Sequence, residues 1–304
     1  MVLKNFNELI SKVQNNDFIK IVAVAAAHDE HTLEAVFKAK ADKIVDPILV
    51  GDKIKICEIL KKLNLEYDCN KIINTVDDNE SAEKVVELIK ENKADFIMKG
   101  KIQTADLLRK VVNKEKGLGT GGIMSHVAIN EIPSYKKLIA TTDGGMMMYP
   151  NLEEKKEIIE NAVGVFKAFG YEKPKVSILA AVEKLNPKMP ETVDADLLKK
   201  MNLSGDIKDC VVEGPISYDL SISSEAARIK EYESPVAGDA DILIVPNITA
   251  GNILGKVLTE TAGAKMAGII IGAKVPIALT SRGATFEEKY LSLVLSASAV
   301  SRRK

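Results

Sequence analysis

The chain has 304 residues, of which 42 are Lys or Arg and 43 are Asp or Glu, so its net charge is −1. A nearly neutral chain has no overall positive field with which to bind nucleic acid or an anionic membrane. Hydrophobic residues make up 46% and charged residues 28%, which is typical of a globular protein with one large or two ordinary cores. We therefore expect no nucleic-acid or membrane partner, and a local cluster of donors must bind any anionic substrate.

Short β-branched runs alternate with longer segments of helical period in the first half. The run Ile19–Ala27 predicts a strand, and the next segment carries Leu33, Val36 and Phe37 on one helical face. The same alternation predicts helices over 31–43, 53–65, 80–92 and 104–114, and further strands over 46–50, 71–75 and 95–99. A charged helix over 151–169 follows the turn at Tyr149-Pro150.

The second half repeats this pattern. It predicts strands over 175–182, 209–213 and 242–245, a pair of short strands over 267–271 and 276–279, and helices over 195–201, 223–231, 250–261 and 285–301. This order predicts an α/β protein with mainly parallel sheets covered by helices. A boundary near Thr142–Pro150 divides the chain into two halves.

Glycine and proline follow four of these strands, in the turns Lys99-Gly100, Glu213-Gly214-Pro215, Pro246-Asn247 and Ser281-Arg282-Gly283. In open parallel sheets, ligands bind beyond the carboxyl ends of the strands. These turns are therefore the first candidates for a functional site.

Arg282 is the strongest local signal, because it is one of only five arginines and directly follows a strand. Its guanidinium offers a bidentate fork for a phosphate or for a carbonyl that develops negative charge; the alternative is a structural salt bridge. Glu287 and Glu288 begin the last helix, where acids suit the helix dipole. They are also placed to accept a proton from a thiol near Ser281.

Other polar residues have similar positions: Lys99, Thr104, Asn247 and Asn252 follow strand ends. His126 comes after Ser125, close to the glycine-rich segment 117–122. That segment is either a mobile loop or a source of backbone N–H groups for an anion.

Several known signatures are missing from the sequence: it has no phosphate loop, no nucleophile elbow and no H-E-x-x-H helix. A helix start capped by Asp29 or Thr32 explains the segment His28-Asp29-Glu30-His31 without a metal, so we expect no metal site. Cys57, Cys69 and Cys210 are sparse and odd in number, which favours buried thiols in a reducing cytosol. No secretory signal is visible, and a cytoplasmic location is expected.

In their order along the chain, these segments resemble the family of phosphate acetyl- and butyryltransferases. The resemblance covers nearly the whole chain and rests on Met98-Lys99-Gly100 with Thr104 and Arg109, Met124-Ser125-His126-Val127-Ala128, Thr142-Asp143 with Tyr149-Pro150, Asn186-Pro187-Lys188-Met189-Pro190, Val245-Pro246-Asn247, Gly251-Asn252 and Leu279-Thr280-Ser281-Arg282. The segments around Ser125 and Pro187 follow the butyryl branch more closely than the acetyl branch.

The resemblance implies two α/β/α domains of the isocitrate/isopropylmalate dehydrogenase-like fold, with the active site in the cleft between them. The expected first domain comprises residues 1–143 plus 281–304, the second comprises 144–280, and the protein is expected to form a homodimer or a higher homo-oligomer. Ser281 and Arg282 are then catalytic. Acetyltransferase members have a proposed basic aspartate seven residues after the serine; that position is Glu288 here, with Glu287 just before it, and both stay candidates. The remaining expected substrate-binding residues are Lys99, Thr104, Ser125, His126, Asn247 and Asn252.

The implied reaction is butyryl-CoA plus phosphate giving butyryl phosphate plus coenzyme A, with coenzyme A as a substrate and no bound cofactor. The main alternative is phosphate acetyltransferase. Two rivals are an NAD-dependent decarboxylating dehydrogenase of the same fold and a two-lobed solute-binding protein. Met146-Met147-Met148 either adapts to an apolar acyl tail or fills core.

Overall fold

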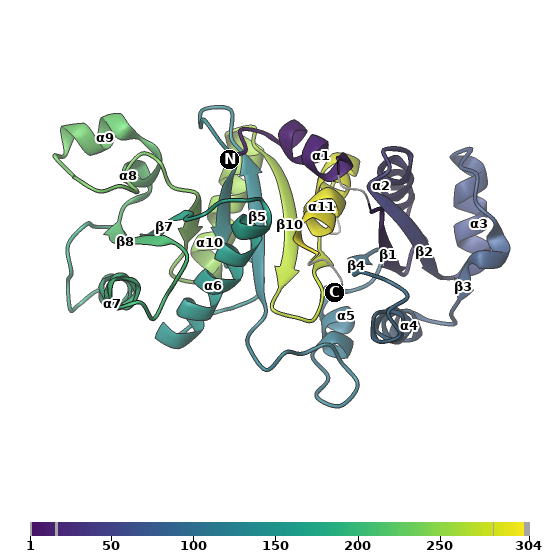
Figure 1. Cartoon of the computed structure of the whole chain (residues 1–304). Helices are drawn as coiled ribbons and strands as arrows, with labels where there is room; N and C mark the ends of the chain where they lie inside the picture. Colours follow the sequence, from purple (N-terminus) through teal and green to yellow (C-terminus); the bar gives the residue numbers. More distant parts are fainter. Residues whose placement is uncertain (1, 16–17, 282, 301–304) are drawn as a thin grey trace. The chain divides into compact units, whose positions relative to one another are not determined.

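A computed structural model describes residues 2–15, 18–281 and 283–300. The chain forms two compact units. One, here called the inserted unit, comprises Met1–Phe6 and Ile123–Met266; the other, called the flanking unit, comprises Asn7–Gly122 and Ala267–Lys304. Each unit is built on a sheet with helices against its faces, so the α/β class predicted from the sequence is confirmed (Figure 1).

The sheet of the flanking unit has the strand order β3-β2-β1-β4-β11-β10. Strand β1 pairs in parallel with β2 and β4, β4 pairs in parallel with β11, and only β10 and β11 run antiparallel among these pairs. The strands are β1 (Lys20–Ala25), β2 (Val45–Gly51), β3 (Ile73–Asn74), β4 (Phe96–Lys99), β10 (Lys265–Ile271) and β11 (Ile277–Ala278). Since Ala25 lies opposite Lys99 and Met98 opposite Ala278, the carboxyl ends of β1, β4 and β11 share one edge.

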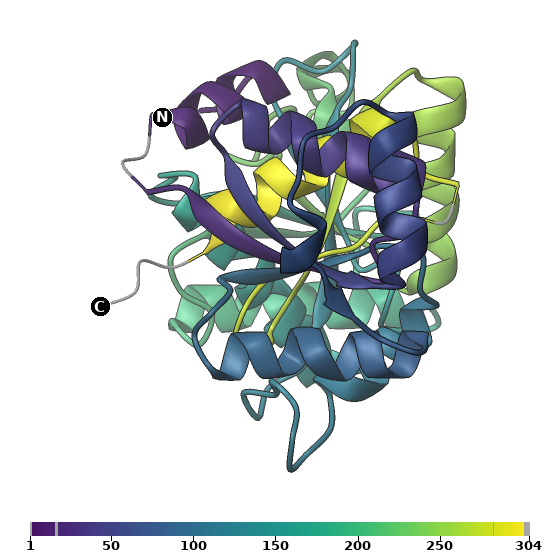
Figure 2. The same ribbon diagram turned by 90° about the vertical axis from the view of Figure 1, so that its right-hand side faces the viewer.

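Helices α2 and α11 pack together on one face of this sheet, and α4 and α5 pack on the other, as the two views show (Figure 1, Figure 2). The side chains of Asp29, Asp52 and Asp77 cap α2, α3 and α4 by accepting backbone N–H groups of the first turn. The helical segments are α1 (Phe6–Gln14), α2 (Glu30–Ala41), α3 (Lys53–Lys62), η1 (Cys69–Lys71), α4 (Asp78–Lys90), α5 (Thr104–Val111) and α11 (Phe286–Ala299).

The sheet of the inserted unit has the order β5-β6-β9-β7-β8, and it is parallel except for the β5–β6 pair. The strands are β5 (Ser125–Glu131), β6 (Ile139–Thr142), β7 (Lys175–Leu179), β8 (Val211–Ile216) and β9 (Ile242–Ile244). The helices are α6 (Leu152–Ala168), α7 (Pro190–Ser204), α8 (Tyr218–Ile222), α9 (Ser224–Ile229) and α10 (Ile248–Lys256), which continues into one π-helical turn, η2 (Val257–Thr261).

One face of this sheet is covered by α8 and α10. Leu243 and Val245, on and just after β9, belong to a buried cluster against which Tyr218 from α8 and Leu254 from α10 pack. The opposite face carries α6 and α7 (Figure 1). Burial of these apolar side chains on both faces explains why the central strands read as continuous hydrophobic runs.

The compact units begin and end at other residues than the sequence predicted. Residues 123–143 lie in the inserted unit because β6 pairs with β9, and residues 267–280 lie in the flanking unit because β11 pairs with β4. The predicted segments did not include β5, β6, α1 or α8. Helix α7 starts at Pro190 rather than at 195, since proline suits the first helical position.

The cysteines differ from the expectation of three buried thiols. Cys57 on α3 is joined to Cys69 on η1 by a disulfide, with the Cα atoms 6.1 Å apart. Both residues are half-exposed, whereas Cys210 is buried and free. Within the described ranges, none of the helices combines the length and apolar character needed to cross a membrane.

A network of ion pairs connects the amino ends of β6, β7 and β9 in the inserted unit. The Nζ atom of Lys137 lies 2.6 Å from a carboxylate oxygen of Asp241, and both side chains are 5% exposed. Lys137 also contacts Asp239, which pairs with Lys136 and Lys175 as well. Burial by itself would raise the pKa of Asp239, but the three ammonium groups outweigh it and hold this pKa below its ordinary value.

We expect Lys137→Met to lower the free energy of unfolding by about 3–5 kcal/mol, because the change leaves the buried carboxylate of Asp241 without its partner. Lys136→Met is the matched control: it removes another Asp239 partner from a side chain that is 62% exposed, and should cost less than about 1 kcal/mol. Urea unfolding at neutral pH measures both. An equal loss of unfolding free energy in the two variants would show that the buried ion pair stabilises the fold no more than the exposed one.

Candidate active site

The edge of the flanking sheet collects several of the predicted residues. Strand β4 ends at Lys99, α5 begins at Thr104, and Ser281 lies just beyond β11. Because β4 and β11 are parallel neighbours in register, Lys99 and Ser281 leave the sheet at the same edge. Lys99 is 2% exposed and donates to the carbonyl oxygen of Gly100 at 3.3 Å, while Ser281 is exposed.

Gly100 allows the two central strands to end so close together. Its N–H donates to the carbonyl oxygen of Ala25, and a Cβ at this position would lie 2.6 Å from that same oxygen. A side chain would also meet the carbonyl oxygen of Ala26. Only glycine permits this approach, which places the turn after β4 against the turn after β1.

The last helix, α11, begins five residues after Ser281. The hydroxyl of Thr285 caps α11 by accepting the N–H of Glu288 at 3.2 Å. Glu287 is exposed and Glu288 is half-buried, so the two acids of this first turn differ in their surroundings. Arg282, the strongest signal in the sequence, lies outside the described residues.

Two further polar atoms at this edge were not selected from the sequence. The Nδ1 atom of His28, after β1, and the Oγ1 atom of Thr280, after β11, are buried without a hydrogen-bond partner among the described residues. Both residues follow strands, so selecting polar residues at the ends of predicted strands, as was done for Lys99, would have found them as well. The predicted cap of α2 is confirmed: Asp29 accepts the N–H of Thr32 at 2.9 Å.

The edge of the inserted sheet collects the other predicted residues. Antiparallel pairing places Ala128 of β5 opposite Thr141 of β6, so the start of β5 lies beside the end of β6. Parallel pairing of β6 with β9 then adds Asn247, which follows β9. His126, Asn247 and Asn252 therefore come from adjoining segments of one sheet edge.

His126 is half-buried and lies against a glycine. A Cβ on Gly145 would be 2.9 Å from the imidazole Cγ atom, so the ring rests on the backbone there. The Nδ1 atom of His126 is buried and has no hydrogen-bond partner among the described residues. Desolvation lowers the pKa of His126 below its ordinary value of 6.5, although the charge of Asp143 acts in the opposite direction.

Ser125 and the two asparagines have identifiable partners. Ser125 is fully buried, and its hydroxyl accepts from Asn161 of α6 at 3.0 Å, which favours a role in positioning β5. Asn247 caps α10 by accepting the N–H of Ala250 at 3.0 Å. Asn252 is exposed and donates to the carbonyl oxygen of Gly144 at 3.5 Å.

Asp143 is a residue at this edge that the sequence did not assign. It is 2% exposed, and its carboxylate accepts backbone N–H groups from His126, Gly145 and Met146. The signal available in the sequence was Thr142-Asp143-Gly144-Gly145, an acid at a strand end followed by two glycines.

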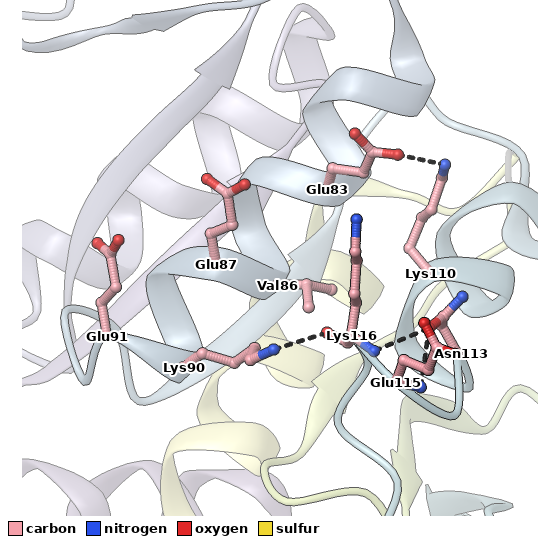
Figure 3. A pocket seen from close by; sticks show the side chains of 9 residues that line it. All are labelled: Glu83, Val86, Glu87, Lys90, Glu91, Lys110, Asn113, Glu115 and Lys116. Carbon is pink, nitrogen blue, oxygen red and sulfur yellow. Dashed lines mark hydrogen bonds and ion pairs between the residues drawn. The ribbon is translucent and has the colours of Figure 1, made fainter.

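A groove elsewhere on the flanking unit lies between α4, α5 and the turn after α5 (Figure 3). It has a volume of about 870 Å³ and is lined mostly by charged side chains of both signs; Glu83 and Lys110 form an ion pair across it. It contains none of the predicted site residues. In the described part of the chain, no three His, Cys, Asp or Glu residues form a group suited to a metal ion.

Comparison with known proteins gives one family. The model of the family described as phosphate acetyl/butaryl transferase matches residues 5–91 and 80–297. A phosphate butyryltransferase of Clostridium acetobutylicum is 46% identical over 97% of this chain and 98% of its own length. A phosphate acetyltransferase of Thermotoga maritima is 44% identical over 91% of this chain and 94% of its own length.

Solved structures agree with this result. A branched-chain phosphotransacylase from Enterococcus faecalis is 34% identical, has a TM-score of 0.81, and matches 94% of this chain and 100% of its own. A 4-hydroxythreonine-4-phosphate dehydrogenase from Burkholderia phymatum shares the fold alone, with 15% identity and a TM-score of 0.56 over 94% of this chain and 100% of its own. The expected likeness to dehydrogenase folds is confirmed at this coarse level.

We expect two of the three histidines to titrate below 6.5, because burial lowers the pKa of both His28 and His126. The unfolded chain then binds protons more readily, so the free energy of unfolding should fall as the pH drops below about 6.5. Imidazole NMR titration measures the pKa values, and His126→Gln should remove one of the two shifted signals. A His126 signal that titrates at or above 6.5 would contradict the burial of this ring.

Proposed function

The chain belongs to the phosphate acetyl/butaryl transferase family, and we propose that it transfers a short acyl group between coenzyme A and inorganic phosphate. The observation that carries this proposal is the end-to-end match to relatives named for that reaction, at 46% and 44% identity. The sheet edges described above supply polar residues of the kinds that the reaction needs. Acyl-CoA and phosphate are thus the proposed substrates, and the proposed assembly is a homo-oligomer.

In this reaction a phosphate oxygen attacks the thioester carbon, the C–S bond breaks, and coenzyme A leaves as a thiolate that takes up a proton. The products are acyl phosphate and free coenzyme A. In the reverse direction, a thiol with a pKa of about 8.5 must lose its proton to attack the acyl phosphate. The protein therefore needs donors for phosphate oxygens, a donor for the developing oxyanion and one group that carries a proton.

We assign the donors to the edge of the flanking sheet. Ser281 is exposed there and donates to the thioester oxygen as charge develops. Arg282, the next residue, holds phosphate oxygens with its bidentate fork; this role rests on the family resemblance. Lys99 adds a positive charge at the same edge, where β4 ends.

Helix α5 begins at Thr104, five residues after the end of β4 at Lys99. The side chain of its N-cap residue, Gln103, makes no capping hydrogen bond, and the carboxylate of its first turn, Asp106, pairs with Arg109 at 3.0 Å. We propose that Lys99 and Thr104 bind the phosphate side of the reaction. His126, Asn247 and Asn252, with Ser125 supporting β5, are proposed to bind the acyl-CoA side.

The preferred acyl group is proposed to have four carbons. Relatives named for butyryl and for acetyl transfer are almost equally similar, so identity does not decide between them. Met146 and Met147 are half-buried and Met148 is 68% exposed, which does not favour their role as core filler. Flexible thioethers at the surface suit an apolar tail of variable shape.

The experiment that tests the proposed function follows thiol release from acetyl-, propionyl-, butyryl- and isobutyryl-CoA, with and without phosphate and without metal or nicotinamide. We expect release only with phosphate. Butyryl-CoA should exceed acetyl-CoA by roughly tenfold in kcat/KM, since each buried methylene contributes about 0.8 kcal/mol and burial is incomplete. Release without phosphate would indicate a hydrolase instead. A maximum at acetyl-CoA would overturn the chain-length assignment but not the reaction class.

The proton carrier is proposed to be Glu288, because it is half-buried and occupies the family position, whereas Glu287 is exposed. Glu288→Gln should lower kcat by roughly two to four orders of magnitude with an unchanged melting temperature. Glu287→Gln is the matched control from the same helical turn and should stay near wild type. The reverse ranking would move the role to Glu287, and two active variants would remove both acids from the mechanism.

A further inference from the structure

The carboxylate of Asp143 makes a hydrogen bond at the end of the antiparallel β5–β6 pair. The pairs Ala128–Thr141 and Ile129–Ala140 set the register of β5 against β6, and continuing it places His126 opposite Asp143. Strand β6 ends at Thr142, one residue before this position. Here a carboxylate oxygen of Asp143 accepts the N–H of His126 at 2.9 Å. The position of His126 therefore depends on this side chain.

The other carboxylate oxygen organises the segment that follows. It accepts the N–H groups of Gly145 at 2.7 Å and Met146 at 2.8 Å. One buried carboxylate thus joins the start of β5 to the turn after β6. These three charge-assisted bonds are of the stronger kind.

The turn itself fits closely between two neighbours. A Cβ on Gly144 would lie 2.8 Å from the backbone of Gly251 in α10, and one on Gly145 would meet the His126 ring. The first large side chains after this turn are therefore those of Met146, Met147 and Met148. Their far end is fixed as well, because the carbonyl oxygen of Met148 accepts the N–H of Ile248, the first residue of α10.

The segment Met146–Met148 is thus held at both ends and yet presents large apolar side chains partly to solvent. Met148 is 68% exposed, and the following Tyr149 is 79% exposed. Exposed apolar side chains on a backbone this well fixed are characteristic of a binding surface for an apolar group.

We propose that Asp143 is a positioning residue that determines acyl-chain selectivity, by holding Met146–Met148 beside His126 as the apolar surface for the acyl tail. This inference rests on the proposed function. Asp143 touches neither substrate in it; it acts through the backbone of the segment. An amide cannot replace it, because one of its two terminal atoms donates, and that atom would face a backbone N–H in place of an acceptor.

The test compares kcat/KM for butyryl-CoA and acetyl-CoA in the wild type and in Asp143→Asn, at saturating phosphate and below the melting temperature of each protein. The butyryl-to-acetyl ratio should fall about tenfold, mainly through the KM of butyryl-CoA. The matched control is Asp241→Asn. Asp241 is also buried and also accepts a backbone N–H, from Lys175, but it lies at the opposite end of the neighbouring strand β9. The control variant loses stability and should keep the wild-type ratio.

A second variant, Met146→Ala, truncates the segment directly at a half-buried position and should lower the same ratio. In the double variant the two effects should not add, because both act through one segment. Should Asp143→Asn fail to fold, the butyryl-to-acetyl ratio of Met146→Ala tests whether this segment contacts the acyl tail. An unchanged ratio in the folded variants, or the same fall in Asp241→Asn, overturns the inference. A wild type without phosphate-dependent thiol release overturns the proposed function itself, which is a different result.

Discussion

Parallel strand pairing is the constraint on which the candidate site depends. Strands that run in one direction must all end at the same edge of a sheet, and the helices that follow them begin there. In the flanking unit this brings together the turns after β1, β4 and β11, although β1 ends at Ala25 and β11 only at Ala278. In the inserted unit it brings together the turns after β6 and β9. No local sequence motif is needed to assemble these residues; the hydrogen-bond pattern of the sheet does it.

The two edges meet this constraint in different ways. At the flanking edge the strands approach so closely that Gly100 has no room for a side chain. The carbonyl oxygens of Ala25 and Ala26, at and just after the end of β1, accept its N–H and that of Lys101. At the inserted edge the β5–β6 pair is antiparallel, and just beyond the end of β6 the Asp143 carboxylate accepts the N–H of His126. In both places the backbone N–H groups at the strand ends find an acceptor: those of Gly100 and Lys101 bond to backbone carbonyls, and that of His126 bonds to a buried carboxylate.

The sequence predicted most of the fold because central parallel strands are buried on both faces. The runs around Val22, Ile97 and Leu243 are almost wholly apolar, and helices of clear period separate them. It missed β5 because buried polar residues interrupt that strand: Ser125 bonds to α6, and Asn130 bonds to neighbouring backbone and to Thr141. Such partners are known only after the tertiary structure is known. For the same reason, Lys99 and Ser281 could be selected from their positions after strands, whereas the role of Asp143 required the register of β5 against β6.

The inserted sheet has its buried ion pair and its candidate site residues at opposite ends of the same strands. At the amino ends of β6 and β9, the buried charges of Lys137 and Asp241 lie 2.6 Å apart, and Asp239 neutralises the lysines around it. At the carboxyl ends, the Nδ1 atom of His126 and the Oγ1 atom of Thr142 are buried without hydrogen-bond partners among the described residues. Each unpaired buried polar group costs roughly 1–3 kcal/mol, so the two atoms at this edge are candidates for contact with a ligand. Local groups of this kind, already desolvated, are what a chain with a net charge of −1 needs in order to bind the proposed anionic substrates.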